Sequence, residues 1–415
     1  MQRVSGSWIF IIIMLLTDLY VFQAVKVIMQ PAHPKLRLVV FGAYWTFSAI
    51  AVATIALIPF FSIDQWNKTF RTYFFAILIG IFLSKAVTVV FLIVDDLRRL
   101  LQWGGGKLFY QYVQEEPFKA TGISRSVFMS WFALGVGGGL MTTLLYGFTN
   151  KYRYQLKKIR LPFPNLPTSF KGLKIIHISD VHSGSFTDKA AVAHGIDIIM
   201  KQNADLILFT GDLVNDRADE MNNYTDIFSK LHAPLGVFST LGNHDYGDYR
   251  RWKSPEAKVE NLERLKQLQK DMGWRLLMNE HVALERNGEQ IALLGIENWS
   301  AKSNFPKYGK MDKAYAGTEQ YPFKILMSHD PSHWDAEVRP QYSDVDLMLS
   351  GHTHGMQFGV EVPGFKWSPV QYVYKQWAGL YEEASQKLYV NRGYGFLGYP
   401  GRVGILPEIT LIELV

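Results

Sequence analysis

Carboxylate, amide and imidazole side chains recur in five short polar segments of the second half of the chain. These are Ser179-Asp180-Val181-His182, Thr210-Gly211-Asp212, Leu241-Gly242-Asn243-His244-Asp245, Ser328-His329-Asp330 and Gly351-His352-Thr353-His354-Gly355. Carboxylate oxygen and neutral imidazole nitrogen are ligands for borderline divalent cations such as Mn²⁺, Fe²⁺ and Zn²⁺, whereas Ca²⁺ prefers oxygen alone. The residue types therefore indicate a site for Mn²⁺, Fe²⁺ or Zn²⁺.

Each polar segment stands where a short β-rich run stops, and ligands of open α/β sheets bind at such strand ends. Two residues spaced i, i+2 in a loop can face one ion, which suits Asp180 with His182 and His352 with His354. We therefore expect the segments to converge on a site for two metal ions. Two cations about 3.5 to 4 Å apart lower the pKa of a shared water and neutralise the charge that builds during displacement at phosphorus.

In order and spacing, the five segments resemble the motifs of the calcineurin-like metallophosphoesterase superfamily, and in particular those of its membrane-anchored bacterial members. The resemblance covers residues 174–415. It implies that the metals are held by two sets of ligands: Asp180, His182 and His354 for one ion, and Asn243, His329 and His352 for the other, with Asp212 bridging.

The resemblance also assigns His244 to the substrate, where an imidazolium would stabilise the transition state or protonate the leaving oxygen. Asp245 is expected to orient the ring of His244, as a carboxylate behind a catalytic imidazole does. Outside these motifs we expect three residues to reach the phosphate, because an arginine fork suits phosphate oxygens: Asn298, Arg392 and Arg402. A surface ion pair explains either arginine equally well. Asp188, Asp216 and Asp330 are interpreted as loop carboxylates or helix caps.

The elements around these motifs alternate between short β-rich runs and amphipathic helices. Strands are predicted at residues 174–179, 206–209, 236–240, 291–295, 324–327, 346–349, 387–390 and 409–413, and helices at 189–202 and 255–272. This alternation predicts an α/β domain. The family resemblance implies a two-sheet sandwich flanked by helices, the calcineurin-like phosphoesterase fold, over residues 171–415.

The first part of the chain is different, because it consists of long apolar runs with few charges. Four runs, at residues 8–29, 36–61, 73–94 and 127–148, are each near the ~20 residues that a helix needs to cross a bilayer. We predict a four-helix transmembrane anchor over residues 1–150. Asp18 and Lys85 lie inside these runs and need partners; mutual or interfacial pairing is favoured over a functional polar site.

Two polar segments flank the last apolar run. Residues 95–124 are predicted to form a polar loop, partly an interfacial helix, with a break at Gly104-Gly105-Gly106. Residues 151–170 are predicted to be a basic juxtamembrane stretch followed by a stiff proline-rich linker, which would favour contact with anionic lipid headgroups.

Charge does not decide which side of the membrane the catalytic domain faces. The basic residues flanking the four spans divide eight against seven, and Ser124-Arg125-Ser126-Val127-Phe128 resembles a degenerate twin-arginine export signal. The dense basic cluster at residues 151–160 favours the cytoplasm slightly. We expect an integral protein of the cell (inner) membrane.

Composition excludes several other functions. The net charge of +6 is modest for 415 residues, so nucleic-acid binding is not expected, and the absence of cysteine excludes disulfides, thiolate metal sites and a cysteine nucleophile. The expected function is metal-dependent hydrolysis of a phosphoester or pyrophosphate bond by an activated hydroxide. By analogy with family members, a lipid-linked substrate such as UDP-diacylglucosamine is the sharpest hypothesis. The alternatives are a general phosphatase or phosphodiesterase acting on soluble substrates, and a membrane sensor or transporter whose second domain binds a ligand without turnover.

Overall fold

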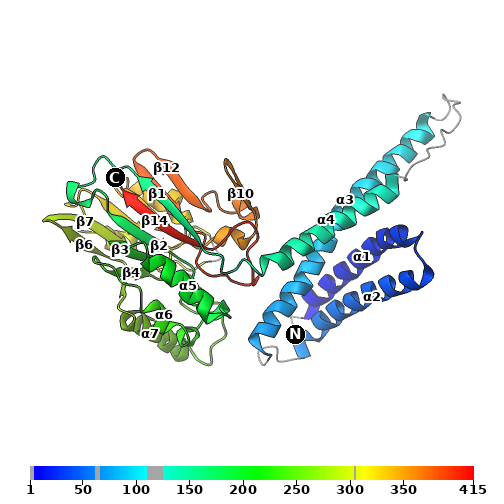
Figure 1. Ribbon diagram of the computed structural model, residues 1–415, viewed down its shortest axis with the longest axis horizontal. Helices are drawn as coiled ribbons and strands as arrows, with labels where there is room; N and C mark the ends of the chain where they lie inside the picture. Colours follow the sequence, from blue (N-terminus) through cyan, green and yellow to red (C-terminus); the bar gives the residue numbers. More distant parts are fainter. Residues whose placement is uncertain (1–3, 61–65, 110–124, 303–304) are drawn as a thin grey trace. The chain divides into compact units, whose positions relative to one another are not determined.

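The computed structural model describes residues 4–60, 66–109, 125–302 and 305–415 of the chain (Figure 1). It divides into two compact units, Met1–Tyr146 and Gly147–Val415. The boundary lies close to the end of the last apolar run.

The first unit contains four long helices, as predicted. They are α1 (Val4–Met29), α2 (Pro34–Leu57), α3 (Lys68–Phe109) and α4 (Arg125–Gly147), and a short turn, η1 (Ile58–Phe60), follows α2. Each helix is long and apolar enough to cross a membrane. The chain is therefore an integral membrane protein. The predicted end of the second span, Phe61, lies outside the described residues.

The loop prediction for residues 95–124 is wrong over its first half, because α3 continues to Phe109. Ion pairs one turn apart support this extension: Arg98 Nη2 lies 2.6 Å from Asp95 Oδ1, and Arg99 Nε lies 3.5 Å from Asp95 Oδ2. At 42 residues the helix is roughly 63 Å long, well beyond the thickness of the hydrocarbon core. The rest of the predicted loop, residues 110–124, lies outside the described residues, as does the start of the export-like segment at Ser124.

Asp18 and Lys85 pair with each other, which is one of the two arrangements that the sequence favours. Lys85 Nζ lies 2.6 Å from Asp18 Oδ1 and donates to Ser48 Oγ at 2.9 Å. The ammonium also lies 4.5 Å from the centre of the Tyr44 ring. Opposite charges that meet inside an apolar bundle satisfy each other. The mutual pairing that the sequence favours is therefore confirmed.

The second unit is built on two six-stranded sheets and a small hairpin. The first sheet has the order β1-β14-β2-β3-β4-β5 and the second the order β12-β13-β9-β8-β7-β6, while β10 pairs with β11. The strands are β1 (Gln155–Leu161), β2 (Lys174–Ile178), β3 (Leu206–Thr210), β4 (Val237–Thr240), β5 (Arg275–Leu276), β6 (Glu280–Arg286), β7 (Glu289–Gly295), β8 (Lys324–Met327), β9 (Leu347–Ser350), β10 (Val360–Val362), β11 (Phe365–Trp367), β12 (Gly379–Glu383), β13 (Gln386–Val390) and β14 (Glu408–Leu414).

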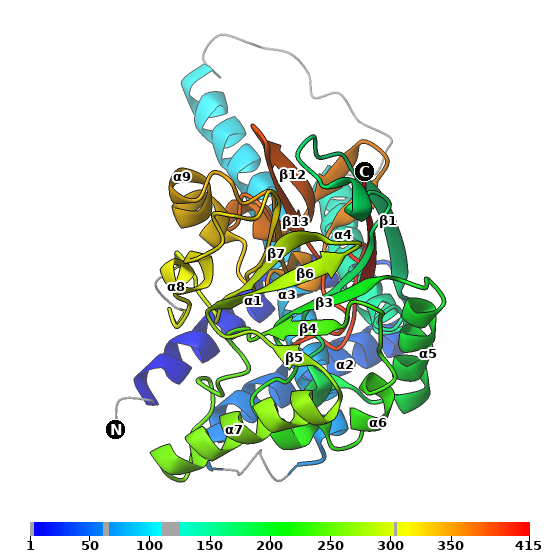
Figure 2. The ribbon, with the colours of Figure 1, turned by 90° about the vertical axis from the view of Figure 1, so that its left-hand side faces the viewer.

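The two sheets pack face to face, and helices cover their outer faces (Figure 2). Alternate side chains of one strand enter different layers, so Ile175 lies in the core between the sheets and Ile176 in the layer under the helices. This burial on both faces explains the continuous apolar runs of the strands. The helices are α5 (Lys189–Met200), α6 (Thr225–Phe228), α7 (Pro255–Asp271), α8 (Met311–Tyr315) and α9 (Arg339–Gln341).

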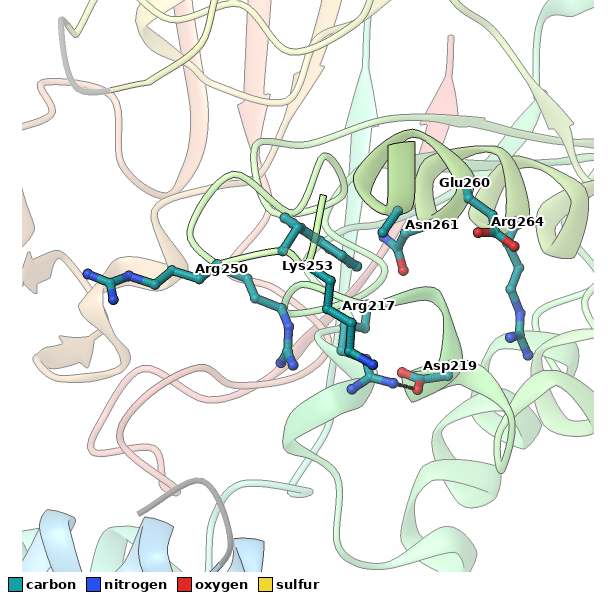
Figure 3. A pocket seen from close by; sticks show the side chains of 10 residues that line it. Arg217, Asp219, Arg250, Lys253, Glu260, Asn261 and Arg264 are labelled. Atoms are coloured by element: carbon teal, nitrogen blue, oxygen red, sulfur yellow. Dashed lines mark hydrogen bonds and ion pairs between the residues drawn. The ribbon is translucent and has the colours of Figure 1, made fainter. Parts of the chain in front are cut away.

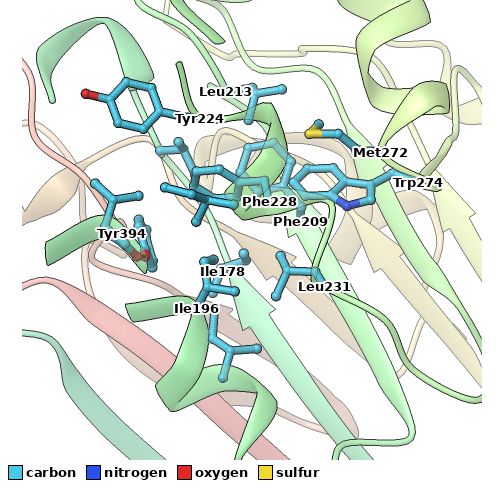
Figure 4. Close-up of a cluster of buried hydrophobic side chains, with 14 of the residues drawn as sticks. Ile178, Ile196, Phe209, Leu213, Tyr224, Phe228, Leu231, Met272, Trp274 and Tyr394 are labelled. Carbon is cyan, nitrogen blue, oxygen red and sulfur yellow. Dashed lines mark hydrogen bonds between the residues drawn. The ribbon is translucent and has the colours of Figure 1, made fainter. Parts of the chain in front are cut away.

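The outer layer of the first sheet is a large apolar cluster (Figure 4). Phe209 of β3 packs against Trp274 with ring centres 5.4 Å apart, and Val192 and Ile196 of α5 are buried in the same cluster. Asp188 is the N-cap of α5, because its carboxylate accepts the Ala191 N–H at 3.0 Å, so the interpretation of Asp188 as a cap is confirmed. The predicted two-sheet α/β sandwich with flanking helices is also confirmed.

The predicted linker at residues 151–170 is instead part of this domain. Strand β1 pairs in parallel with β14, from Gln155 beside Glu408 to Leu161 beside Leu414. Leu161, Phe163 and Leu166 are buried in the core between the sheets. The reason for the difference is that β1 is an edge strand, where lysine and arginine are common, and such charges resemble those of a lipid-binding stretch.

Candidate metal centre

The five polar segments meet at one edge of the sandwich, because they follow strands that run in parallel. Strands β2, β3 and β4 are parallel neighbours in the first sheet, and β8 and β9 are parallel neighbours in the second. The carboxyl ends of parallel strands lie at the same edge of a sheet, so the loops after them converge. The predicted convergence of side chains follows from this topology.

One group of candidate ligands is formed by Asp180, His182 and His354, whose ligand atoms all lie within 4.8 Å of one another. Nε2 of His354 is 3.3 Å from Oδ1 of Asp180. The rings of His182 and His354 are stacked, with centres 4.9 Å apart. All three side chains are buried.

A second group is formed by Asp212, His329 and His352, again within 4.8 Å of one another. The amide oxygen of Asn243 joins this group, because it lies 2.8 Å from Nδ1 of His352 and 3.2 Å from Nε2 of His329. The suggestion that His352 and His354 face one ion, made from their i, i+2 spacing, is therefore wrong. Left-handed backbone at His352 and His354 turns the two rings into different groups.

Asp212 lies between the two groups. Its Oδ2 atom is 3.5 Å from Nε2 of His182 and 3.2 Å from Nε2 of His329. A carboxylate in this position can face a cation in each group.

Two imidazole Nε2 atoms at the centre lack the hydrogen bonds that buried polar atoms normally make. Within the described part of the chain, Nε2 of His182 and Nε2 of His354 have no hydrogen-bond partner. Both atoms face carboxylate oxygens at 3.5 and 3.3 Å. Because buried polar atoms in native proteins almost always have a partner, these nitrogens fit ligation of a metal ion in the first group.

Backbone strain is concentrated at the same residues. Five of the seven candidate ligands adopt left-handed φ angles between 47° and 71°, a region that L residues other than glycine seldom occupy: Asp180, His182, Asp212, His352 and His354. Each such residue costs about 1–3 kcal/mol, and such strain clusters at functional sites. The strain thus supports the same set of residues as the distances.

Glycine is required where these loops approach one another. A Cβ atom at Gly351 would lie 2.2 Å from Oδ2 of Asp180, and one at Gly242 would lie 2.2 Å from Oδ1 of Asp212. These glycines let the loop backbones pack directly against the two carboxylates.

His244 stands beside the first group, with its ring centre 4.9 Å from that of His182. Its Nδ1 atom lies 2.7 Å from the carbonyl oxygen of Asn215. A carbonyl only accepts hydrogen bonds, so Nδ1 carries the proton and Nε2 is left for a substrate. His244 is only partly buried, which leaves it accessible.

The prediction that Asp245 orients the His244 ring is wrong. The carboxylate of Asp245 accepts backbone N–H groups from the loops instead: Gly242 at 2.9 Å, Asp212 and Leu213 at 2.8 Å, and Val214 at 3.3 Å. Asp245 therefore holds the two loops that carry Asp212 and Asn243, and the ring of His244 is held by Asn215.

Tyr374 and Asp330 support the second group, and neither was predicted to do so. Tyr374 donates its hydroxyl proton to Oδ2 of Asp330 at 3.2 Å, and the same hydroxyl lies 2.9 Å from Nε2 of His352. Such partners fix the orientation of a ligating histidine. Asp330 is thus more than the loop carboxylate we expected. The sequence gives one usable signal, since Asp330 directly follows His329.

Arg402 also supports a candidate ligand rather than offering its fork to solvent. Its buried guanidinium donates to the carbonyl oxygens of His354 and Gly393 at 3.2 Å, and to that of Arg392 at 2.7 Å. It lies 3.2 Å from Nδ1 of His354. Burial lowers the pKa of Arg402 to about 9. In this structure Arg402 positions the His354 loop.

The other two predicted phosphate contacts are also engaged within the protein. Arg392 is buried and its guanidinium pairs with Glu408 and, at 2.8 Å, with Glu361. Asn298 donates to the Pro306 carbonyl at 2.9 Å, and its Oδ1 atom has no partner among the described residues. Among the described residues, neither Arg392 nor Asn298 makes a side-chain hydrogen bond or ion pair with a candidate metal ligand.

Burial sets the protonation of most of the centre. It lowers the pKa of His182 to about 3 and that of His352 to about 4, so both imidazoles are neutral at pH 7 and have a free lone pair. Burial opposes ionisation of Asp212, but His329 and His244 hold its pKa well below the usual range. Burial would lower the pKa of His329, whereas Asp212 raises it to about 10, so metal binding there would release a proton.

Two protein families match the chain, one for each unit. The family described as "Probable Calcineurin-like phosphoesterase, transmembrane domain" matches residues 2–151, and "Calcineurin-like phosphoesterase" matches residues 173–356.

Three relatives illustrate the similarity. "Transmembrane protein with metallophosphoesterase domain" of Danio rerio is 28% identical over 74% of this chain and 67% of its own length. "Uncharacterized metallophosphoesterase YkuE" of Bacillus subtilis (strain 168) is 30% identical over 60% of this chain and 81% of its own length. "Phosphodiesterase YaeI" of Escherichia coli (strain K12) is 29% identical over 58% of this chain and 82% of its own length.

Proposed function

Because the chain belongs to the calcineurin-like phosphoesterase family and is therefore a metal-dependent phosphoester hydrolase, we propose that it works with two divalent ions held at the edge of the sandwich. The observation that carries this proposal is the place of Asp212, whose Oδ2 lies within 3.5 Å of a histidine of each ligand group. One carboxylate can then serve both ions.

The proposed ligands keep the assignments that the motifs implied. Asp180, His182 and His354 hold one ion, and the other is held by Asn243, His329 and His352, with Asp212 between them. Mixed imidazole and carboxylate ligands suit Mn²⁺, Fe²⁺ or Zn²⁺. When bound, two such ions lower the pKa of a water, bind phosphoryl oxygens and neutralise charge that builds in the transition state.

His244 is the residue proposed to handle the leaving group. Its Nδ1–H is held by the carbonyl of Asn215, which fixes the ring and directs Nε2 away from that contact. A proton on Nε2 can pass to the leaving oxygen as the phosphorus–oxygen bond breaks. Asp245 contributes by holding the loops that carry Asp212 and Asn243.

For the substrate, we propose a phosphoester or pyrophosphate linked to a lipid, with UDP-diacylglucosamine as the specific candidate. Four membrane-spanning helices would keep the catalytic unit where such molecules are concentrated. We place the protein in the inner membrane with its catalytic unit in the cytoplasm. The basic residues that flank the spans divide eight against seven, so only the dense basic cluster at residues 151–160, which follows the last span, favours that side.

The alternative substrate class is a soluble phosphomonoester or phosphodiester, which the similarity to a protein named a phosphodiesterase supports. Hydrolysis by the full chain in lipid discs with added Mn²⁺ separates the two. Release of UMP from UDP-diacylglucosamine, abolished by His244→Gln, would support the lipid-linked proposal. Hydrolysis of bis(p-nitrophenyl) phosphate without any release of UMP would contradict it and leave the soluble class.

A further inference from the structure

A cavity of about 320 Å³ lies in the second unit, beside the start of α7 (Figure 3). In Figure 3, Glu260, Asn261 and Arg264 project from this helix, and Arg217 lies next to Asp219. The lining carries five cationic side chains and two carboxylates: Arg217, Arg250, Arg251, Lys253 and Arg264, with Asp219 and Glu260. We call this cavity the basic pocket.

The basic pocket has an excess of positive charge. Five cations against two carboxylates leave a surplus of three, and one carboxylate, Asp219, is already paired with Arg217. Among the described residues, Arg250, Arg251 and Lys253 form no ion pair. Like charges gathered round a cavity repel one another and create a positive potential that attracts anions.

The pocket is partly preorganised for an anion. The guanidinium of Arg250 lies 5.9 Å from the centre of the Trp252 ring, and Trp252 donates its indole N–H to the carbonyl of Gly247 at 2.8 Å. Stacking on a fixed aromatic ring restricts an arginine and leaves its fork available. An arginine fork matches the oxygens of a phosphate group.

The loops that wall the basic pocket also hold His244. Asn215, whose carbonyl holds the His244 ring, is two residues before Arg217. The ring centre of Tyr249, which directly precedes Arg250, lies 4.6 Å from that of His244 with the two rings tilted, and its hydroxyl accepts a hydrogen bond from the Asn243 amide at 2.8 Å. A molecule bound at the metal centre thus has the basic pocket close beside it.

Asp216 supports this proximity. Burial raises the pKa of its carboxyl group, while His244 and then Arg250 oppose the rise. The Asp216 carboxylate is therefore within electrostatic reach of a residue from each site. Its carbonyl oxygen accepts the Asn261 amide at 3.3 Å, which ties the loop to α7.

We propose that the basic pocket binds a second phosphate group, one that is not hydrolysed at the metal centre. The inference rests on the proposed function. It predicts that a further phosphate group, next to the one that is cleaved, binds in the basic pocket during hydrolysis. This group belongs either to the substrate or to the membrane surface. The same chemistry can come from a pyrophosphate-bearing substrate or from the headgroup of an anionic lipid, and the test separates these sources.

The test is a calorimetric titration of inorganic pyrophosphate into the full chain, held in phosphatidylcholine discs and stripped of metal by chelation. Removing the metal excludes pyrophosphate binding to ions at the catalytic centre. We expect saturable binding that weakens about tenfold in the double variant Arg250→Gln, Arg251→Gln, because two forks are lost.

Lys270→Gln is the matched control, because it removes one exposed charge from the other end of α7, roughly 20 Å along the helix from Ala257. Its affinity should stay within about twofold of the wild type, given the screening of distant surface charges. Equal affinities in the double variant and the control, or no saturable binding at all, would overturn the proposal.

The melting temperature of the double variant shows whether it folds. If it does not fold, Arg264→Gln is measured in its place. This single change on α7 should weaken binding about threefold, a fraction of the effect of two forks. An affinity equal to that of Lys270→Gln would contradict the proposal.

Repeating the titration in discs that contain phosphatidylglycerol identifies the source of the phosphate. Weaker pyrophosphate binding there would assign the pocket to a lipid headgroup, and unchanged binding would assign it to the substrate. Hydrolysis of bis(p-nitrophenyl) phosphate by the metal-loaded wild type is a separate test of the proposed function. If the wild type hydrolyses this ester but does not bind pyrophosphate, the phosphate-binding role of the basic pocket is refuted and the proposed function is not.

Discussion

Oδ2 of Asp212 lies 3.2 Å from Nε2 of His329, in the middle of a centre in which burial keeps His182 and His352 neutral. The same oxygen reaches His182 at 3.5 Å. One carboxylate thus lies beside histidines from loops of both sheets, so the packing of the two sheets determines the geometry of the proposed metal site. The predictions below probe the residues that keep this arrangement in place.

His244→Gln should lower kcat for bis(p-nitrophenyl) phosphate by about 10²- to 10⁴-fold, the usual contribution of a general acid. Bound metal should be unchanged, because the ring lies beside the ligand groups and not within them. Metal analysis together with initial rates measures both. His232→Gln, at an exposed histidine, is the control, and an equal loss in both variants would contradict the assignment.

Asp245→Ala should lower the free energy of unfolding by about 3 kcal/mol, because several buried backbone N–H groups lose their acceptor. Bound metal should fall as well, since the loops carrying Asp212 and Asn243 loosen. Thermal unfolding and metal analysis of the full chain test this. A variant of unchanged stability with a reduced kcat would instead revive the idea that Asp245 orients His244.

Arg402→Lys should weaken metal binding about 10- to 100-fold, as the loss of support behind a ligand does. A lysine keeps the charge but cannot donate to several carbonyls around His354 at once. The measurement is activity as a function of Mn²⁺ concentration. Arg160→Lys, at an exposed arginine, should leave the curve in place; a wild-type curve for Arg402→Lys would argue against a positioning role.

Gly351→Ala should reduce bound metal to one ion or fewer, because the added Cβ would lie 2.2 Å from Oδ2 of Asp180 and displace that ligand. Gly139→Ala on α4 has open space around it and is the matched control. Two ions bound per chain in Gly351→Ala would show that the loop yields without disturbing Asp180.

The stability of the metal-free protein should fall as pH drops below about 6.5. Burial lowers the pKa of His177 to about 3, whereas the unfolded chain binds a proton at this residue near its ordinary value of about 6.5. Protonation therefore favours unfolding between these values, by roughly 2–3 kcal/mol at pH 4.5. Thermal unfolding of His177→Gln should show a shallower pH dependence than the wild type. Parallel profiles would rule out a buried neutral His177.

The sequence predicts the parts of this structure that repeat a simple physical pattern. Four apolar runs predict four spans, and short apolar strands that end in polar motifs predict the sandwich and the location of its centre. Strand β1 could not be recognised because its basic residues, Lys157, Lys158 and Arg160, resemble a lipid-binding stretch, and the extension of α3 could not be recognised because three consecutive glycines usually break a helix.

The supporting contacts of the centre could not be predicted, because they join residues far apart in the chain. Tyr374 is 22 residues from His352, and Arg402 is 48 residues from His354. Nothing in the local sequence distinguishes either residue from an ordinary surface side chain. The true role of Asp245 depends on backbone N–H groups of a loop 32 residues away, which only the fold brings close.

The most direct test of the dinuclear centre is titration of Mn²⁺ into the metal-free full chain while hydrolysis of bis(p-nitrophenyl) phosphate is followed. The account predicts a rate that rises until two ions are bound per chain and that is lost in Asp212→Asn, whose neutral amide cannot serve both ions. An undiminished rate without metal, or in Asp212→Asn, would contradict it.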